Sequence, residues 1–84
     1  MSKKQKLIAR FKKNPKDFTW DELVTMLVYL GFIEEKLGKT SGSRAMFMNQ
    51  EGVTIRTHKP HPAKIIKGYV IKEIIEILER NQKI

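Results

Sequence analysis

The sequence predicts an α+β domain in which a helix, a three-stranded antiparallel sheet and a second helix follow an extra basic N-terminal helix. Three observations lead to this fold class. Apolar residues recur at helical spacing on both sides of the middle of the chain. Between residues 32 and 57 the hydrophobic period changes towards two, as in strands. Short, turn-like links separate these strand segments, so neighbours in sequence should pair antiparallel.

A short basic helix should come first. Ser2 and Gln5 have the spacing of a capping box, in which each side chain accepts a hydrogen bond from the other residue's backbone N–H. Asn14-Pro15 should end this helix, because proline disfavours helical geometry in the residue before it. The apolar stripe of the helix consists of Leu7, Ile8 and Phe11. Through this stripe the arm could dock on the body, which we favour, or it could fray and act as an electrostatic leash.

The second helix has a clear start signal. Thr19 and Glu22 form another capping box, and Phe18 stands where it can staple onto Leu23. The helix should end at Gly31, since glycine readily adopts the left-handed conformation that stops a helix. Its apolar stripe consists of Trp20, Leu23, Val24, Leu27 and Leu30. We assign this stripe to the core and give Trp20 no binding role.

Three short strands are expected over residues 32–37, 45–49 and 53–57. Residues 38–43 connect the first two strands, and the hairpin-sized turn 50–52 connects the second and third. The three strands should form an antiparallel meander.

The stretch His58-Lys59-Pro60-His61-Pro62 should run extended over the surface, because each proline lacks a backbone donor and fixes its own backbone angle. A final helix is expected over residues 69–81, with an apolar stripe at Val70, Ile71, Ile74, Ile75 and Leu78. Two helices must then cover one face of the sheet, because an uncovered apolar face would be costly. The opposite face should stay open to a ligand or partner.

Positive charge is unevenly distributed along the 84 residues, whose formal net charge is +8. Residues 1–16 carry seven basic side chains and no acid, whereas residues 17–35 carry five acids and no base. Residues 36–67 carry seven bases against one acid, Glu51. These blocks favour a polyanion, most simply a nucleic acid, lying along part of the surface. The alternative interpretation is a solvated charge pattern that aids solubility.

Composition excludes several classes of protein. The chain has no cysteine, which rules out disulfides and thiolate chemistry and fits a reducing cytoplasm. Its apolar runs are too short to span a bilayer, and the N-terminus has charges but no apolar signal-peptide stretch. We expect one small soluble cytoplasmic domain with a modest core, whose stability a partner would increase.

Three segments resemble the HicA family of bacterial toxins, which has a compact double-stranded-RNA-binding-like fold. They are K-D-F-T-W-D-E-L-V-T-M-L-V-Y-L-G-F, G-S-R-A-M-F and H-K-P-H-P-A-K-I-I-K. The resemblance implies a HicA-like ribonuclease domain over residues 17–84, preceded by a basic helical arm over residues 1–16. It further implies a toxin that cleaves messenger RNA without a metal or cofactor, and a cognate HicB antitoxin that neutralises it.

The family pattern at the second strand is Gly-Ser-His, and the resemblance implies that its histidine is catalytic. Gly42 and Ser43 match this pattern, whereas Arg44 stands in the place of the histidine. Cleavage through the neighbouring 2′-hydroxyl needs a base, an acid and positive charge on the phosphate. Histidine suits the proton steps, because its unperturbed pKa is about 6.5. Arginine stays protonated and its planar fork matches phosphate oxygens, so it suits the phosphate.

We therefore expect His58 to transfer protons and Arg44 to hold the phosphate together with Arg56. On an alternating third strand, Arg56 and His58 share the face opposite Ile55. The alternative for His58 is a surface histidine without a role. His61 should orient its loop through a hydrogen bond. The residues expected to contact RNA, mainly its backbone, are Gly42, Ser43, Arg56, Lys36, Lys39, Lys59, Lys64 and Lys67.

Three functions remain open from the sequence. The first is a HicA-like ribonuclease toxin whose site is rebuilt around Arg44. The second is an RNA-binding module on the same fold that cuts nothing. The third is a protein-interaction module whose basic surface meets an acidic partner. Met46 and Met48 are most simply packing residues, or else a soft patch for the antitoxin on the open face.

Overall fold

The computed structural model describes residues 2–35, 44–60 and 64–84. In this part of the chain the elements run α1 (Lys3–Lys12), α2 (Trp20–Tyr29), β1 (Ile33–Glu35), β2 (Arg44–Met48), β3 (Thr54–His58) and α3 (Gly68–Arg80). The predicted fold class is confirmed: a helix, a three-stranded antiparallel sheet and a helix follow an additional N-terminal helix. The predicted link over residues 38–43 lies outside the described residues.

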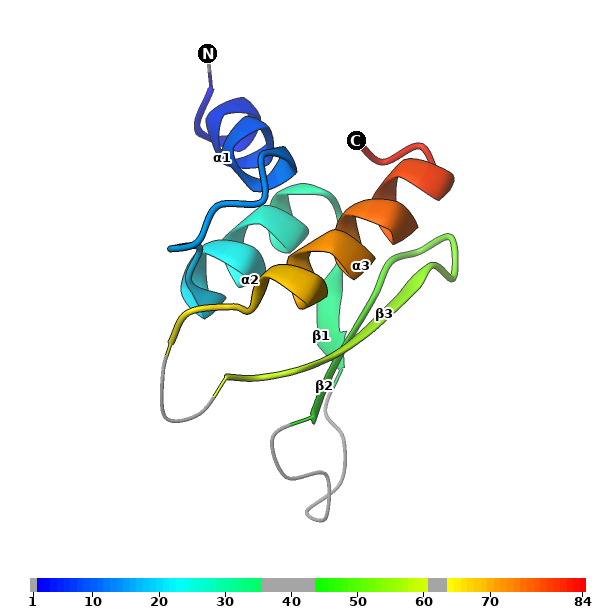
Figure 1. Ribbon diagram of the computed structural model, residues 1–84. Helices are drawn as coiled ribbons and strands as arrows, with labels where there is room; N and C mark the ends of the chain where they lie inside the picture. The colour runs from blue at the N-terminus through cyan, green and yellow to red at the C-terminus, as the bar shows by residue number, and fades with distance from the viewer. Residues whose placement is uncertain (1, 36–43, 61–63) are drawn as a thin grey trace.

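The elements form three layers (Figure 1). The sheet has the order β1-β2-β3, and both pairs are antiparallel. Helices α2 and α3 lie side by side on one face, where α2 contacts β1 and α3 contacts β3. Helix α1 lies on the far side of this helix layer and contacts both α2 and α3. The other face of the sheet carries no helix among the described elements.

Both predicted capping boxes are present. Ser2 and Gln5 form the first at the start of α1, and Thr19 and Glu22 form the second at the start of α2. Helix α1 ends at Lys12, and Asn14 takes a φ of 50°, a left-handed conformation that asparagine tolerates better than most residues. Gly31, with a φ of 91°, follows the end of α2 as expected.

Helix α1 docks on the body, as we favoured from the sequence. Phe11 has 0% of its surface exposed, and Leu7 and Ile8 are partly buried against the core. The rings of Phe11 and Phe18 lie 4.9 Å apart between centroids. Because an aromatic side chain of this size buries much apolar surface, α1 is an integral part of the core.

Alternation along the strands separates a buried face from an open face. Ala45, Phe47, Ile55 and Thr57 are buried beneath the helices. Trp20, 7% exposed, lies 5.9 Å from Phe47 between ring centroids, so its assignment to the core is confirmed. Strands β2 and β3 are each displaced by one residue from the predicted ranges.

The segment before α3 is tied to the start of α2. The backbone N–H of Trp20 donates to the Lys64 carbonyl at 2.9 Å, and the N–H of Ile66 donates to the Phe18 carbonyl at 2.9 Å. These bonds fix where α3 begins relative to α2. Within the described residues, no helix combines the length and the apolar character needed to cross a bilayer.

Candidate nucleic-acid interface

The open face of the sheet brings cationic residues of two strands together. In the register of β2 and β3, Arg44 lies directly opposite His58, and Met46 lies opposite Arg56. Residues that face each other in an antiparallel pair point to the same side of the sheet, with Cβ atoms about 5 Å apart. Arg44, Arg56 and His58 are all exposed. The three residues selected from the sequence therefore share one surface.

This surface forms a hollow of about 410 Å³. Its lining consists of Arg44, Ala45, Met46, Arg56, Thr57 and His58. Ala45 and Thr57 turn their side chains to the buried face. They therefore form the floor of the hollow, between β2 and β3. The walls therefore consist of two guanidinium groups, one imidazole and one thioether.

Both arginines of the hollow are free to bind an anion. Neither forms an ion pair with a carboxylate of the described residues, and residues 36–43 and 61–63 contain no Asp or Glu. A guanidinium can donate two parallel hydrogen bonds to phosphate oxygens. Two such groups around one histidine can hold a phosphodiester beside a proton-transfer group.

The basic residues expected around this site are only partly placed by the structure. Lys59 is exposed directly after His58, and Lys64 and Lys67 are exposed on the segment leading into α3. None of these three lysines lines the hollow of Arg44. Lys67 instead lines a separate hollow with Lys16 at the start of α3. The remaining predicted residues, Lys36, Lys39, Gly42, Ser43 and His61, lie outside the described residues.

Met46 belongs to the site, although the sequence pattern offered it only for packing or for a partner patch. It is half-buried and lines the hollow between Arg44 and Arg56. The signal was the alternation along β2, which puts Arg44, Met46 and Met48 on one face. On the neighbouring strand Ile33 is 67% exposed and lies opposite Met48. The open face thus changes along β2 from cationic at Arg44 to apolar at Met48, and the exposed Glu35 of β1 faces the same side opposite Met46.

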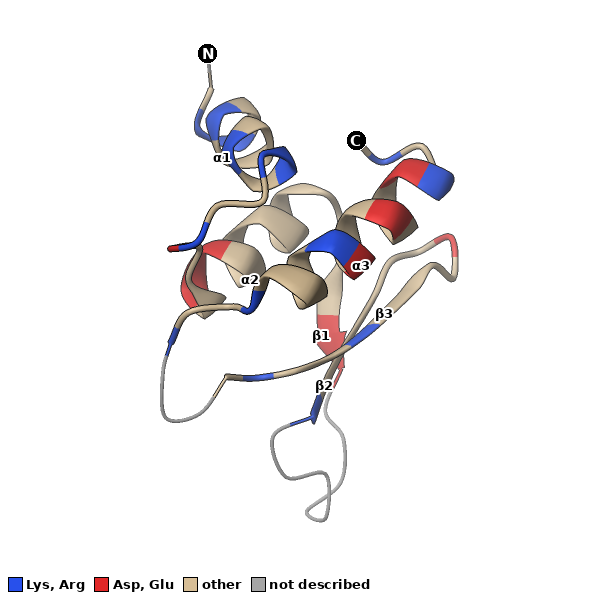
Figure 2. Cartoon of the chain, in the orientation of Figure 1, with Lys and Arg blue, Asp and Glu red and all other residues tan. Residues whose placement is uncertain are grey.

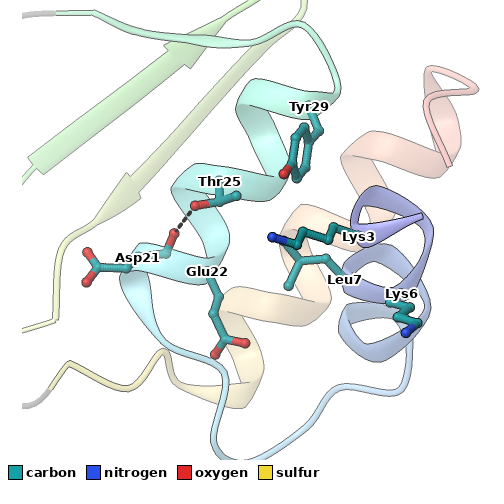
Figure 3. Close-up of a pocket in the computed structure, with 7 residues that line it drawn as sticks. All are labelled: Lys3, Lys6, Leu7, Asp21, Glu22, Thr25 and Tyr29. Carbon is teal, nitrogen blue, oxygen red and sulfur yellow. Dashed lines mark hydrogen bonds between the residues drawn. The ribbon is translucent and has the colours of Figure 1, made fainter. Parts of the chain in front are cut away.

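A second hollow lies between α1 and α2 (Figure 3), well away from Arg44. The α1 side carries Lys3, Lys6 and Leu7, and the α2 side carries Asp21, Glu22, Thr25 and Tyr29. The Thr25 hydroxyl donates to the Asp21 carbonyl at 2.9 Å. Because no histidine lines it and its α2 side carries two carboxylates, this groove lacks the chemistry of the sheet hollow.

A three-stranded sheet backed by two helices, with a cationic hollow on its free face, defines a compact α+β domain that can bind an anion on its open sheet face. The family model described as HicA toxin of bacterial toxin-antitoxin matches residues 20–79, and the chain belongs to this family. The chain is therefore a toxin of a bacterial toxin–antitoxin system. No curated protein and no solved structure matches it. The matched residues include the whole sheet, α2 and most of α3, and they leave α1 outside.

Proposed function

We propose that this toxin binds messenger RNA in the cytoplasm and cleaves it by acid–base ribonuclease chemistry without a metal or cofactor. The observation that carries the proposal is the position of His58 directly opposite Arg44, with Arg56 lining the same hollow. Membership of a toxin family supports it, because an RNA-cleaving activity would account for toxicity. The site supplies a proton-transfer group and two phosphate-binding groups within one small surface.

In the proposed reaction, the 2′-hydroxyl oxygen attacks the adjacent phosphorus and the bond from phosphorus to the 5′-oxygen breaks. His58 takes the proton of the 2′-hydroxyl, and the departing 5′-oxygen receives a proton from solvent. Arg44 and Arg56 hold the non-bridging oxygens, whose negative charge rises in the transition state. The products are a 2′,3′-cyclic phosphate and a free 5′-hydroxyl, so atoms and charges balance.

The surrounding residues would position the RNA rather than cleave it. Lys59, adjacent to His58, would contact the next phosphate along the strand, and His61 would orient its loop. The other proposed RNA-contacting residues are Gly42, Ser43, Lys36, Lys39, Lys64 and Lys67. Contacts of this kind depend on salt and carry little sequence information.

The partner we propose is a cognate antitoxin of the HicB type. A carboxylate-bearing segment of the antitoxin would lie on the open face and neutralise Arg44, Arg56 and Lys59. Met46, Met48 and the exposed Ile33 would give the same segment an apolar surface to cover.

A non-catalytic RNA-binding module is the second candidate function. It is favoured by the residue at position 44: Arg44 stands where the resemblance described above implies a histidine, and arginine is a poor general base because it stays protonated. In that case the same hollow would hold a phosphate and cut nothing.

The test is RNA cleavage in excess chelator by wild type, Arg44→Ala, Arg56→Ala and His58→Ala. Lys72→Ala is the matched control, because Lys72 is also an exposed cation but lies on α3. We expect wild type and the control to cleave, His58→Ala to lose at least about 100-fold in rate, and each arginine variant to lose comparably. RNA binding without cleavage by purified wild type would establish the second candidate instead.

A further inference from the structure

The surface of α1 carries an array of lysines that the proposed reaction does not use. Between residues 2 and 16 the exposed lysines are Lys3, Lys4, Lys6, Lys12, Lys13 and Lys16. No ion pair within the described residues involves any of them, and residues 1, 36–43 and 61–63 contain no Asp or Glu. Figure 2 shows this positive charge along α1. Six uncompensated lysines on one short segment generate a strong local field.

Four of these lysines, Lys3, Lys4, Lys6 and Lys12, are held on a fixed helix, and Lys13 is its C-cap. Phe11 anchors α1 in the core, and the Ser2–Gln5 capping box closes its first turn. Arg10, the exception among the cations of α1, forms ion pairs with Asp17 and Glu22. Its guanidinium also lies 5.1 Å from the ring centre of Phe18. One cation therefore fastens the helix, while the lysines remain exposed and Lys3 and Lys6 border the groove towards α2.

The lysine surface is separate from the hollow on the sheet. Helix α1 lies outside α2 and α3, and those helices lie between it and the strands (Figure 1). Asp21 and Glu22, at the start of α2, form the opposite wall of the groove beside α1 (Figure 3). An anionic strand would be repelled if it crossed α2 at that point. An anion held by α1 must therefore lie on the outward side of the helix.

A lipid surface does not suit this helix. Interfacial helices insert an apolar face between lipids, with their lysines on the other side. In α1 the apolar residues Leu7, Ile8 and Phe11 already pack against the core. A nucleic-acid backbone requires no apolar face and presents charges at regular intervals. Lys6 and Lys13, seven residues or two turns apart, lie on one side of α1 about 10 Å apart along the axis.

We propose that the outward surface of α1 is a second binding site for the phosphate backbone of RNA, remote from Arg44. It holds a part of a long RNA other than the phosphodiester in the sheet hollow. The site raises affinity for long RNA and takes no part in bond cleavage. It lies outside the residues that match the family model.

The test compares two double variants that each remove two positive charges. Lys6→Gln/Lys13→Gln alters α1, and Lys72→Gln/Arg80→Gln alters exposed cations of α3 as the matched control. Binding is measured over a range of salt concentrations with a long 2′-O-methyl RNA. Because this RNA lacks the attacking hydroxyl, the result is independent of whether the protein cleaves RNA.

Each lost phosphate contact should reduce the salt slope by about 0.7, which corresponds to about fivefold in affinity at 0.1 M salt. We expect the α1 pair to weaken binding by roughly 25-fold and the α3 pair by less than about twofold. Both variants should unfold at the wild-type temperature, since all four side chains are exposed. An equal loss in both pairs, or no loss in the α1 pair, overturns the proposal. The proposal is also overturned if the α1 pair loses binding to anionic phospholipid vesicles while its RNA binding is unchanged.

Discussion

At the scale of single residues, position 44 determines what the sheet hollow can do. Arg44 and His58 face each other across β2 and β3, so in the proposed reaction the side chain at position 44 would contact the same phosphate as His58. A guanidinium there supplies charge and hydrogen bonds. It does not transfer protons, because it stays protonated. The hollow has one histidine whereas the proposed reaction moves two protons, so we assign the second proton to solvent.

Arg44→His should therefore increase the cleavage rate of the toxin. Two facing histidines can divide the base and acid roles, and a positioned general acid typically contributes 100-fold or more. We expect at least about a tenfold rise, because part of the gain is offset by loss of the bidentate phosphate contact. Single-turnover cleavage of a defined RNA measures this rise in rate, with Arg56→His, two residue pairs along the ladder, as the control. A slower Arg44→His enzyme would mean that charge at position 44 matters more than proton transfer.

At the scale of elements, short-range sequence patterns were sufficient to predict the helices. They were insufficient to predict how the helices pack against one another. A capping box involves residues three apart, so Ser2–Gln5 and Thr19–Glu22 were readable from the sequence. The pairing of Arg10 with Glu22 joins residues twelve apart on different helices, and no periodic pattern indicates it. The contact of Lys83 with Glu51 joins the C-terminal segment to the β2–β3 turn and is equally invisible to local patterns.

The strands show the same division between local and distant information. Alternation predicted that Arg56 and His58 share a face, because side-chain direction has a period of two. It could not predict that Arg44 lies opposite His58, since register depends on the geometry of the turn at residues 50–52. The one-residue displacement of β2 and β3 from their predicted ranges is what includes Arg44 and His58 in the ladder.

Glu22 links two elements, and its substitutions should separate its two contacts. One carboxylate oxygen accepts from the Thr19 backbone N–H at 3.0 Å, and the other accepts from Arg10 of α1. Glu22→Gln keeps an acceptor for the cap and loses the charge. It should therefore cost less than about 1 kcal/mol, because a third of each paired side chain is exposed and solvent screens the ion pair.

Glu22→Ala removes both contacts and should cost about 1–2 kcal/mol of unfolding free energy. Urea denaturation followed by Trp20 fluorescence measures both variants, and Asp21→Ala serves as the control because Asp21 is exposed and unpaired within the described residues. Equal losses for glutamine and alanine would assign the contribution to the ion pair rather than to the cap.

At the scale of the whole molecule, the charge blocks of the sequence become surfaces on opposite sides of the fold. The basic N-terminal block covers α1, and cations of the middle block face outward from the open sheet. The acidic block contributes Asp21 and Glu22 to the layer between them. Blocks along the chain predicted a polyanion, but only the three-layer arrangement shows two separate cationic surfaces. A partner that silences the sheet hollow need not cover α1.

Because the two cationic surfaces are separate, we expect the antitoxin and a short RNA to compete for the open sheet face only. A cognate HicB-type antitoxin on the open face should displace a short 2′-O-methyl oligonucleotide from the toxin, because in our proposal both contact Arg44 and Arg56. Arg44→Ala/Arg56→Ala should weaken antitoxin binding by about 30-fold or more, since each truncation leaves a partner carboxylate without its cation. Lys6→Gln/Lys13→Gln should leave antitoxin binding unchanged and weaken only long RNA. Titration calorimetry measures the affinity for the antitoxin, and fluorescence anisotropy measures the affinity for RNA. Tight simultaneous binding of antitoxin and short oligonucleotide would show that the antitoxin acts from another surface.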